Sequence, residues 1–199
     1  MITRKEMTRM LLKEGLLSCL VNNSFESVTV TSLCKASGIT RSTFYLHYSN
    51  IMEIVDDLVD DAIAYSKPGM VDNNNLQTIA NTLSAASNSV LLREAYDSIF
   101  DRLPLCQRII RHKKYLPLFL DEQISEYVLQ RIIGREKDRQ GLVMAEALGV
   151  SFDVGVSVFV FLVHGLYAVN KQYKWSQSDE WLEAQKIIFE LVYRGLQSK

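Results

Sequence analysis

The chain has 199 residues, of which 48% are hydrophobic and 23% charged, and its formal net charge is −1. This length and hydrophobic content are enough for a sizeable core, either as one domain or as two closely packed ones. The near-zero net charge excludes a globally basic nucleic-acid-binding protein, so any affinity for nucleic acid has to be local.

Residues 3–22 are predicted to form an amphipathic helix. Its apolar side chains recur at helical spacing and are expected to face the core: Met7, Met10, Leu11, Leu17, Leu20 and Val21. The N-terminal stretch MITRKEMTRM carries interspersed charges and lacks the apolar core of a signal peptide. Three cysteines (Cys19, Cys34, Cys106) without Cys-x-x-Cys spacing predict reduced thiols. Together these features favour a cytoplasmic location.

Residues 28–48, VTVTSLCKASGITRSTFYLHY, are predicted to form two short helices joined by a tight turn. Thr29 can cap the first helix, because its hydroxyl can accept a free backbone N–H. The apolar positions of that helix share one face: Val30, Leu33, Cys34 and Ala36. Gly38 stands where a helix usually ends in a left-handed residue, and Thr40 can cap the second helix.

The second helix is expected to pack Ile39, Phe44 and Tyr48 inward. The side chains left pointing away are Arg41, Ser42, Thr43, Tyr45, Leu46 and His47. Apart from Leu46, they carry groups that bind phosphates or base edges, and the helix contains no Asp or Glu. The alternative is an ordinary helical pair whose polar face touches only water.

Charge is unevenly distributed along the chain. Residues 1–50 hold six Lys or Arg against three Glu, a net of +3, whereas residues 51–65 hold five acids and no base. This local positive charge favours contact with DNA by the N-terminal region.

Several positions at fixed spacing resemble the DNA-binding domain of the tetracycline-repressor (TetR) family of bacterial transcriptional regulators. They are Thr29-Val30, Ser37-Gly38-Ile39 and the run from Thr43 to Tyr48. The resemblance covers about residues 1–60, and the remainder is similar to the family only in length and helical character.

The resemblance implies a role for each matching residue. It implies backbone contacts by Thr40, Thr43, Tyr45 and His47, base contacts by Arg41, Ser42 and Leu46, and DNA contact by Thr29 and Thr31 on the preceding helix. The family often has a phosphate-binding Lys just after the second helix, whereas this chain has Ser49, Asn50 and Ile51. Asn50, or backbone N–H groups at the start of the next helix, could take its place.

Residues 51–65 are predicted to form a further amphipathic helix. Its apolar side comprises Ile51, Ile54, Val55, Leu58 and Ala62. Asp56, Asp57, Asp60 and Asp61 lie mostly opposite, which we interpret as a solvated surface and not as a metal site. Residues 66–75, SKPGMVDNNN, are typical of a linker.

Further helices are predicted at about 76–101, 105–113, 117–139 and 141–148. A basic cluster lies within this region: Arg108, Arg111, His112, Lys113 and Lys114. It is interpreted as a charged helix end in water, with contact to DNA or to an acidic effector as the alternative.

Residues 152–173 are apolar on nearly every side, with an unbroken run from Val158 to Val163. A membrane span is disfavoured by Asp153 and His164, and a buried strand by the length of the segment. A helix that is hydrophobic all round has to be buried on all sides, and a partner subunit can supply the second covering surface. A final helix is expected after Ser178.

The chain is therefore expected to be all-α. A three-helix DNA-binding domain with a helix-turn-helix would occupy residues 1–50, with a connecting helix at 51–66. A C-terminal helical bundle that dimerises would occupy residues 67–199. The family resemblance implies that this bundle forms a homodimer by pairing its last two long helices.

The expected function is that of a repressor released from a palindromic double-stranded DNA operator by a small-molecule effector. Candidate pocket residues are Tyr96, Phe100, Phe119, Tyr127, Met144, Phe159 and His164. The alternative is an activator or co-regulator that acts through a protein partner and has no such pocket. No phosphate loop, nucleophile elbow or His-Glu-x-x-His motif is present in the sequence, so we predict no enzymatic activity, metal or cofactor.

Overall fold

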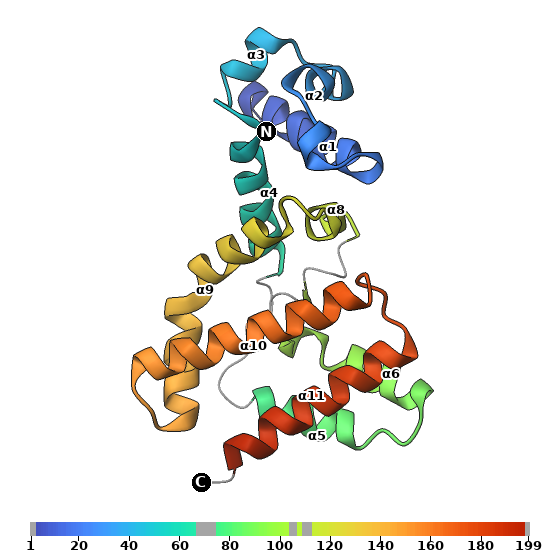
Figure 1. Ribbon diagram of the computed structural model, residues 1–199, viewed down its shortest axis with the longest axis vertical. Coiled ribbons are helices and arrows are strands. Elements are labelled where there is room, and N and C mark those ends of the chain that lie inside the picture. Colours follow the sequence, from blue (N-terminus) through green and yellow to red (C-terminus); the bar gives the residue numbers. More distant parts are fainter. Residues whose placement is uncertain (1–2, 67–74, 104–106, 109–112, 198–199) are drawn as a thin grey trace. The chain divides into compact units, whose positions relative to one another are not determined.

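The computed structural model describes residues 3–66, 75–103, 107–108 and 113–197. This described part is helical and contains no strand, so the all-α prediction is confirmed (Figure 1). The elements, with η for short 3-10 segments, are α1 (Arg4–Asn22), η1 (Phe25–Ser27), α2 (Val30–Ser37), α3 (Arg41–Tyr45), α4 (Ile51–Ser66), α5 (Asn75–Ser84), α6 (Ser89–Ser98), η2 (Phe100–Arg102), α8 (Leu116–Leu120), α9 (Ser125–Leu148), α10 (Phe152–Gln172) and α11 (Asp179–Gln197).

The chain divides into two compact units. The first consists of Met1–Tyr65 with His112–Gly134, and the second of Ser66–Arg111 with Arg135–Lys199. Residues 112–134, expected within the C-terminal bundle, thus belong to the N-terminal unit. Side-chain contacts explain this assignment: Asp121 accepts the N–H of Phe25 at 2.7 Å, and Lys114 forms an ion pair with Glu14.

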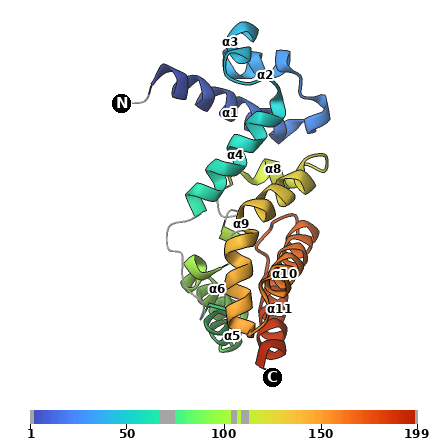
Figure 2. The same cartoon turned by 90° about the vertical axis from the view of Figure 1, so that its left-hand side faces the viewer.

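In the first unit, α1, α2 and α3 lie together in both views (Figures 1 and 2). The buried face of α1 differs from the predicted one: Leu17 and Leu20 are buried as expected, but the other buried positions are Thr8, Leu12, Gly15 and Leu16. Met7, Met10, Leu11 and Val21 are exposed, so their assignment to the core is wrong.

The reason for this difference is the glycine in the middle of α1. A Cβ atom on Gly15 would lie 2.0 Å from Ser37 Oγ and 3.3 Å from Leu33 Cδ1. The two helices therefore come closest where α1 has no side chain, and this close approach directs the face centred on Gly15 toward α2. On α2, Leu33 and Cys34 are buried as predicted, whereas Ala36 is exposed.

The apolar face of α4 agrees with the prediction. Ile54, Val55, Leu58 and Ala62 are buried, while Ile51 at the start of the helix is only partly buried. This helix completes the core of the first unit.

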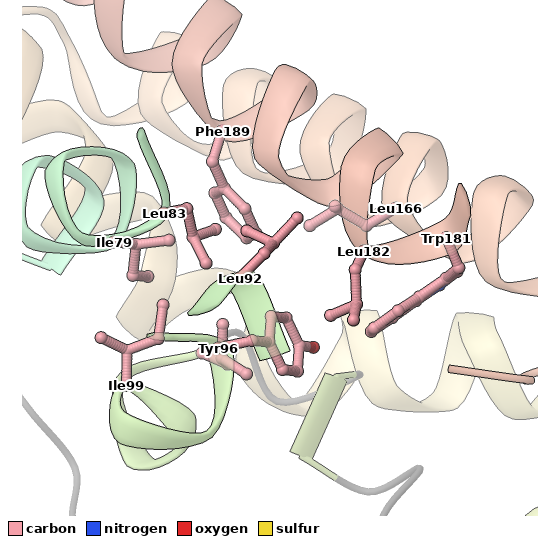
Figure 3. Packing of buried hydrophobic residues seen from close by; sticks show 10 residues of the cluster. Ile79, Leu83, Leu92, Tyr96, Ile99, Leu166, Trp181, Leu182 and Phe189 are labelled. Carbon is pink, nitrogen blue, oxygen red and sulfur yellow. The ribbon is translucent and has the colours of Figure 1, made fainter. Parts of the chain in front are cut away.

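The second unit has its own apolar core, built from α5, α6, α10, α11 and the segment after α6 (Figure 3). Its buried members are Ile79, Leu83, Leu92, Tyr96, Ile99, Leu103, Leu166, Trp181, Leu182 and Phe189. The rings of Tyr96 and Trp181 meet edge to face, with centroids 5.1 Å apart.

Several predicted helix boundaries are wrong in this region. The expected helix at 76–101 is two helices, because the Asn88 side chain accepts the N–H of Leu91 and starts α6 anew. The helices expected at 117–139 and 141–148 are instead α8 and the long α9. Asp121 ends the first of these by accepting the N–H groups of Gln123 and Ile124. Most of the expected helix at 105–113 lies outside the described residues.

Gly141 does not interrupt α9, because its missing side chain is used for packing. A Cβ atom there would lie 2.4 Å from Val156 Cγ2 on α10, and one on Gly155 would lie 2.3 Å from the Gly141 carbonyl oxygen. Within the second unit, α10 and the part of α9 after Gly134 thus cross at glycines that approach each other closely.

The helix expected over 152–173 is confirmed as α10. By length and composition it could cross a membrane, and 28% of its most apolar window is buried inside the protein. One side packs inward through Phe159, Val163 and Leu166, while Phe161 on the opposite side is 74% exposed. The final helix α11 starts as predicted, since Ser178 Oγ accepts the N–H of Trp181 at 3.3 Å.

Candidate nucleic-acid interface

The start of α2 is fixed by two reciprocal hydrogen bonds. Thr29 Oγ1 accepts the N–H of Ser32 at 3.1 Å, and Ser32 Oγ accepts the N–H of Thr29 at 2.9 Å. This capping box leaves the side chain of Thr31 exposed at the N-terminal end of α2. Thr29 is also exposed but its hydroxyl serves as the cap.

The turn after α2 depends on Gly38. This residue has φ +66° and ψ +24°, the left-handed conformation that glycine adopts without steric cost. The N–H of Ile39 donates to the carbonyl of Cys34 at 3.0 Å, which closes the end of α2. The chain is thereby redirected within two residues, and Thr40 can start the next helix.

The helix α3 is only five residues long. Thr40 caps it by accepting the N–H of Thr43 at 3.2 Å. Phe44 is fully buried and Tyr48, which follows the helix, is 3% exposed, so both anchor residues are inward as predicted. Ile39 is partly buried.

Four side chains project from α3 and from its end into solvent. We call them the α3 surface: Arg41, Ser42, Tyr45 and Leu46. Leu46 is 81% exposed, which is unusual for a large apolar residue, and Arg41 brings a positive charge. Thr43 and His47 are partly buried, so they reach solvent less than predicted. The α3 surface thus presents one guanidinium group, two hydroxyl groups and one apolar side chain, all carried by a five-residue helix and the residue that follows it.

The residues just after α3 occupy the place where the TetR family often has a phosphate-binding Lys. Asn50 Oδ1 accepts the N–H of Glu53 at 3.1 Å, and Glu53 Oε2 accepts the N–H of Ser49 at 2.8 Å. The N–H groups of Ser49 and Glu53 are therefore already bonded, and the carboxylate of Glu53 disfavours a phosphate at this helix start. The Nδ2 amide of Asn50 and the N–H groups of Ile51 and Met52 take no part in these bonds.

The acidic side of α4 is not simply a solvated surface, contrary to the prediction. Asp57 forms an ion pair with Arg9, and Asp61 with Lys13, both on α1. On α9, Tyr127 donates its hydroxyl to Asp56 at 2.6 Å, and Arg131 lies 3.3 Å from Asp56 and 3.9 Å from Asp60. The four carboxylates thus bind basic or hydroxyl groups of neighbouring helices.

These ion pairs change the charge available to DNA. Arg9 and Lys13 contribute to the positive charge of residues 1–50, but Asp57 and Asp61 neutralise them. Lys35 on α2 and Arg41 on α3 form no ion pair with another described residue and are exposed. Arg4 and Lys5 at the start of α1 are likewise exposed and form no ion pair with another described residue. The free positive charge of residues 3–66 therefore lies at the start of α1 and on the two helices that carry the candidate interface.

Burial and neighbouring charges also set the protonation of the groups behind α3. Burial raises the pKa of Tyr48, and the hydrogen bond to Asp57 raises it further. Burial raises the pKa of the Cys34 thiol, an effect that Arg41 partly offsets. The Tyr48 hydroxyl and the Cys34 thiol therefore keep their protons at neutral pH.

The seven candidate pocket residues are divided between the two units. Phe119 and Tyr127 lie in the first unit, whereas Tyr96, Phe100, Met144, Phe159 and His164 lie in the second. Tyr96 is part of the packed core, and the Nδ1 atom of His164 lies 2.9 Å from the carbonyl oxygen of Val160. Of the predicted basic cluster, Arg108 is buried, Lys114 pairs with Glu14, and Arg111 and His112 lie outside the described residues.

Two features escaped the sequence analysis. The second unit buries a chain of amides, in which Tyr96 donates to Gln107 at 3.2 Å and Gln107 to Gln185 at 2.9 Å. The first unit has an open cleft of about 650 Å³, lined by the end of α1 and by residues from Lys113 to Gln123. Neither feature could be predicted from the sequence, because Gln107 and Gln185 are far apart in the chain and a surface position of Val21 is not marked by any motif. Within the part of the chain that the structure describes, no three His, Cys, Asp or Glu residues lie close enough to hold a metal ion.

Comparison with known proteins adds no identification. No protein-family model and no curated protein matches this chain. The interface therefore has to be interpreted from its own residues.

Proposed function

We propose that this chain is a sequence-specific, DNA-binding transcriptional regulator that resembles the TetR family and acts in the cytoplasm. In this proposal α2 and α3 form a helix-turn-helix, and α3 enters the major groove of double-stranded DNA. The α3 surface is the observation that carries the proposal, because it exposes Arg41, Ser42, Tyr45 and Leu46 on a helix without acids.

Each group on the α3 surface has a partner on DNA. The guanidinium of Arg41 can bind O6 and N7 of guanine, and Leu46 can pack on the methyl group of thymine. The hydroxyl of Ser42 can bond to a base edge. The hydroxyl groups of Thr40, beside this surface, and Tyr45 suit phosphate oxygens, which position a protein without reading the sequence. In water the exposed Leu46 gains no apolar contact of this kind, which favours DNA contact by the α3 surface over a purely solvated face.

The proposed protein is a homodimer. Phe161 on α10 and Ile187 and Leu191 on α11 are at least half exposed, although both helices belong to the core of the second unit. A second copy would remove these side chains from water, which we favour over lipid as the covering partner. Two α3 helices would then read half-sites about 34 Å apart on a roughly palindromic operator.

Release by a small-molecule effector completes the proposal, making the protein a repressor. It is supported by the family resemblance and by the polar groups that the second unit buries around Gln107 and Gln185. The alternative, an activator or co-regulator that acts through a protein partner, is favoured by the position of Tyr96, a predicted pocket residue, in the packed core of the second unit. A metabolite that raises the melting temperature and lowers operator affinity would support the effector over the protein partner.

The test of DNA reading uses the full chain and the DNA upstream of its own gene. Arg41→Ala should reduce affinity for the bound site by about tenfold or more, because one bidentate base contact is lost. Affinity is measured by fluorescence anisotropy over a salt series, with random DNA of equal length for comparison.

Arg102→Ala is the matched control, because Arg102 is an exposed arginine of the second unit. It removes the same charge and should leave operator affinity nearly unchanged. Equal binding of the wild-type protein to both DNAs, or an unaltered site affinity in Arg41→Ala, would contradict the proposal.

A further inference from the structure

The orientation of α3 depends on contacts outside the helix. A helix of five residues has too few internal hydrogen bonds to be stable alone. The buried rings of Phe44 and Tyr48 anchor it to the core of the first unit, with ring centroids 6.3 Å apart. Whatever fixes Tyr48 therefore also fixes the C-terminal end of α3, where Leu46 is exposed.

Tyr48 is fixed by one carboxylate oxygen of α4. Its hydroxyl donates to Asp57 Oδ2 at 2.6 Å. The same oxygen accepts Nε of Arg9 at 3.1 Å and forms an ion pair with the Arg9 guanidinium. The guanidinium carbon of Arg9 lies 4.9 Å from the centroid of the Tyr48 ring. We call these three residues, Arg9, Tyr48 and Asp57, the Asp57 cluster.

The Asp57 cluster joins three elements at one point: α1, the end of α3 and α4. Because the Tyr48 pKa is raised by burial and by Asp57, the hydroxyl stays protonated and remains a donor. Asp57 also holds the charge of Arg9 within the unit, where it is not available to a phosphate.

A second ion pair between the same helices serves as a comparison. Lys13 of α1 binds Asp61 of α4, one helical turn beyond Asp57. The described structure gives Asp61 no bond to the segment that follows α3. Loss of Asp57 should therefore disturb DNA reading, whereas loss of Asp61 should release Lys13 but leave the segment that follows α3 in place, so any gain in affinity should be the same for operator and random DNA.

We propose that Asp57 is a positioning residue that sets DNA specificity, by orienting α3 through Tyr48 and by withholding Arg9 from the DNA backbone. This inference rests on the proposed DNA-binding function. It predicts opposite effects on the two kinds of binding: affinity for the operator falls, and affinity for random DNA rises.

The experiment compares Asp57→Asn with Asp61→Asn. Both substitutions remove one negative charge from α4 and leave an amide of the same shape. In Asp57→Asn, the ratio of operator to random-DNA affinity should fall about tenfold, the order expected when a charge-assisted hydrogen bond is lost. The salt dependence of random-DNA binding should steepen by about one ion, because Arg9 becomes able to contact a phosphate. In Asp61→Asn the affinity ratio should stay at the wild-type value.

A third variant keeps the test independent of the fold of Asp57→Asn. Tyr48→Phe removes only the hydroxyl and retains the ring, the charges and the Arg9–Asp57 pair. The affinity ratio should again fall, with random-DNA binding unaltered. An unchanged ratio in Tyr48→Phe, or equal ratios in Asp57→Asn and Asp61→Asn, would overturn the inference.

Amide hydrogen exchange separates this inference from the proposed function. Exchange at residues 44–47 should accelerate in Asp57→Asn and Tyr48→Phe but not in Asp61→Asn, whether or not DNA is present. If the wild-type protein prefers no DNA sequence, the proposed function fails while exchange still tests the positioning of α3. If the wild-type protein binds its operator and all three variants match it in affinity ratio and exchange, only the positioning role fails.

Discussion

At the scale of single residues, the candidate interface depends on one backbone conformation and one exposed side chain. Gly38 takes a left-handed conformation that redirects the chain between α2 and α3, and nothing lies within 4 Å of where its Cβ would be. Leu46, at the other end of α3, is 81% exposed. The turn fixes where α3 starts, and the exposed leucine lies on the side of α3 that we propose contacts DNA.

Substitution of Gly38 tests the role of the turn. Gly38→Ala should destabilise the protein by about 1 kcal/mol, through backbone strain alone, because the space for a methyl group is open. It should also weaken operator binding, since relief of the strain shifts α3. Urea unfolding measures the first effect and anisotropy the second.

Gly149 provides the comparison, because it has φ +63° and equally open space, but lies between α9 and α10. Gly149→Ala should cost similar stability and leave DNA affinity unchanged. Equal losses of DNA affinity in both variants would show that general destabilisation, and not the turn, is responsible.

At the scale of elements, glycines set how helices pack. The apolar side chains of Met7, Met10 and Leu11 on α1 are exposed, and the face that carries Gly15 is buried. The spacing of apolar residues therefore predicted the buried face of α1 only in part, through Leu17 and Leu20, because the closest approach of α1 and α2 requires a residue without a side chain. The same reason keeps α9 continuous through Gly141, where the sequence suggested a break.

Two alanine substitutions in α-helices should have opposite effects on stability. Gly15→Ala should destabilise by about 1–3 kcal/mol, because the new methyl group would overlap Ser37 and force α2 away. Gly134→Ala, in the interior of α9, has nothing within 4 Å and should stabilise by about 0.5–1 kcal/mol. Thermal unfolding of the two variants gives both signs, and a stable Gly15→Ala protein would refute the packing argument.

At the scale of the whole molecule, the proposed function requires two copies. One copy offers few unpaired cations in residues 3–66, namely Arg4, Lys5, Lys35 and Arg41, since Arg9 and Lys13 are neutralised within the first unit. Counterion release grows with the number of phosphates contacted, so a single copy should bind DNA weakly. The exposed apolar side chains of α10 and α11 supply a reason for a second copy to associate.

Phe161→Asp tests the dimer. A charge placed in the covered face should raise the dimer dissociation constant by about 100-fold, because it would be buried without a partner. Sedimentation velocity measures the association, and operator affinity should fall in parallel. Val90→Asp is the matched control, since Val90 is 66% exposed on α6 of the same unit. A wild-type protein that sediments as a monomer would remove the basis of the proposal.

The sequence by itself determined the helical class, the caps and turns around α2 and α3, and the outward direction of Arg41, Ser42, Tyr45 and Leu46. These features depend on interactions between residues close in the chain: Thr29 with Ser32, Thr40 with Thr43, and the conformation of Gly38. Only the tertiary structure decided which face of α1 is buried, that residues 112–134 join the N-terminal unit, and that Asp57 binds both Arg9 and Tyr48. Those outcomes depend on contacts between residues far apart in the chain, which helical periodicity does not encode.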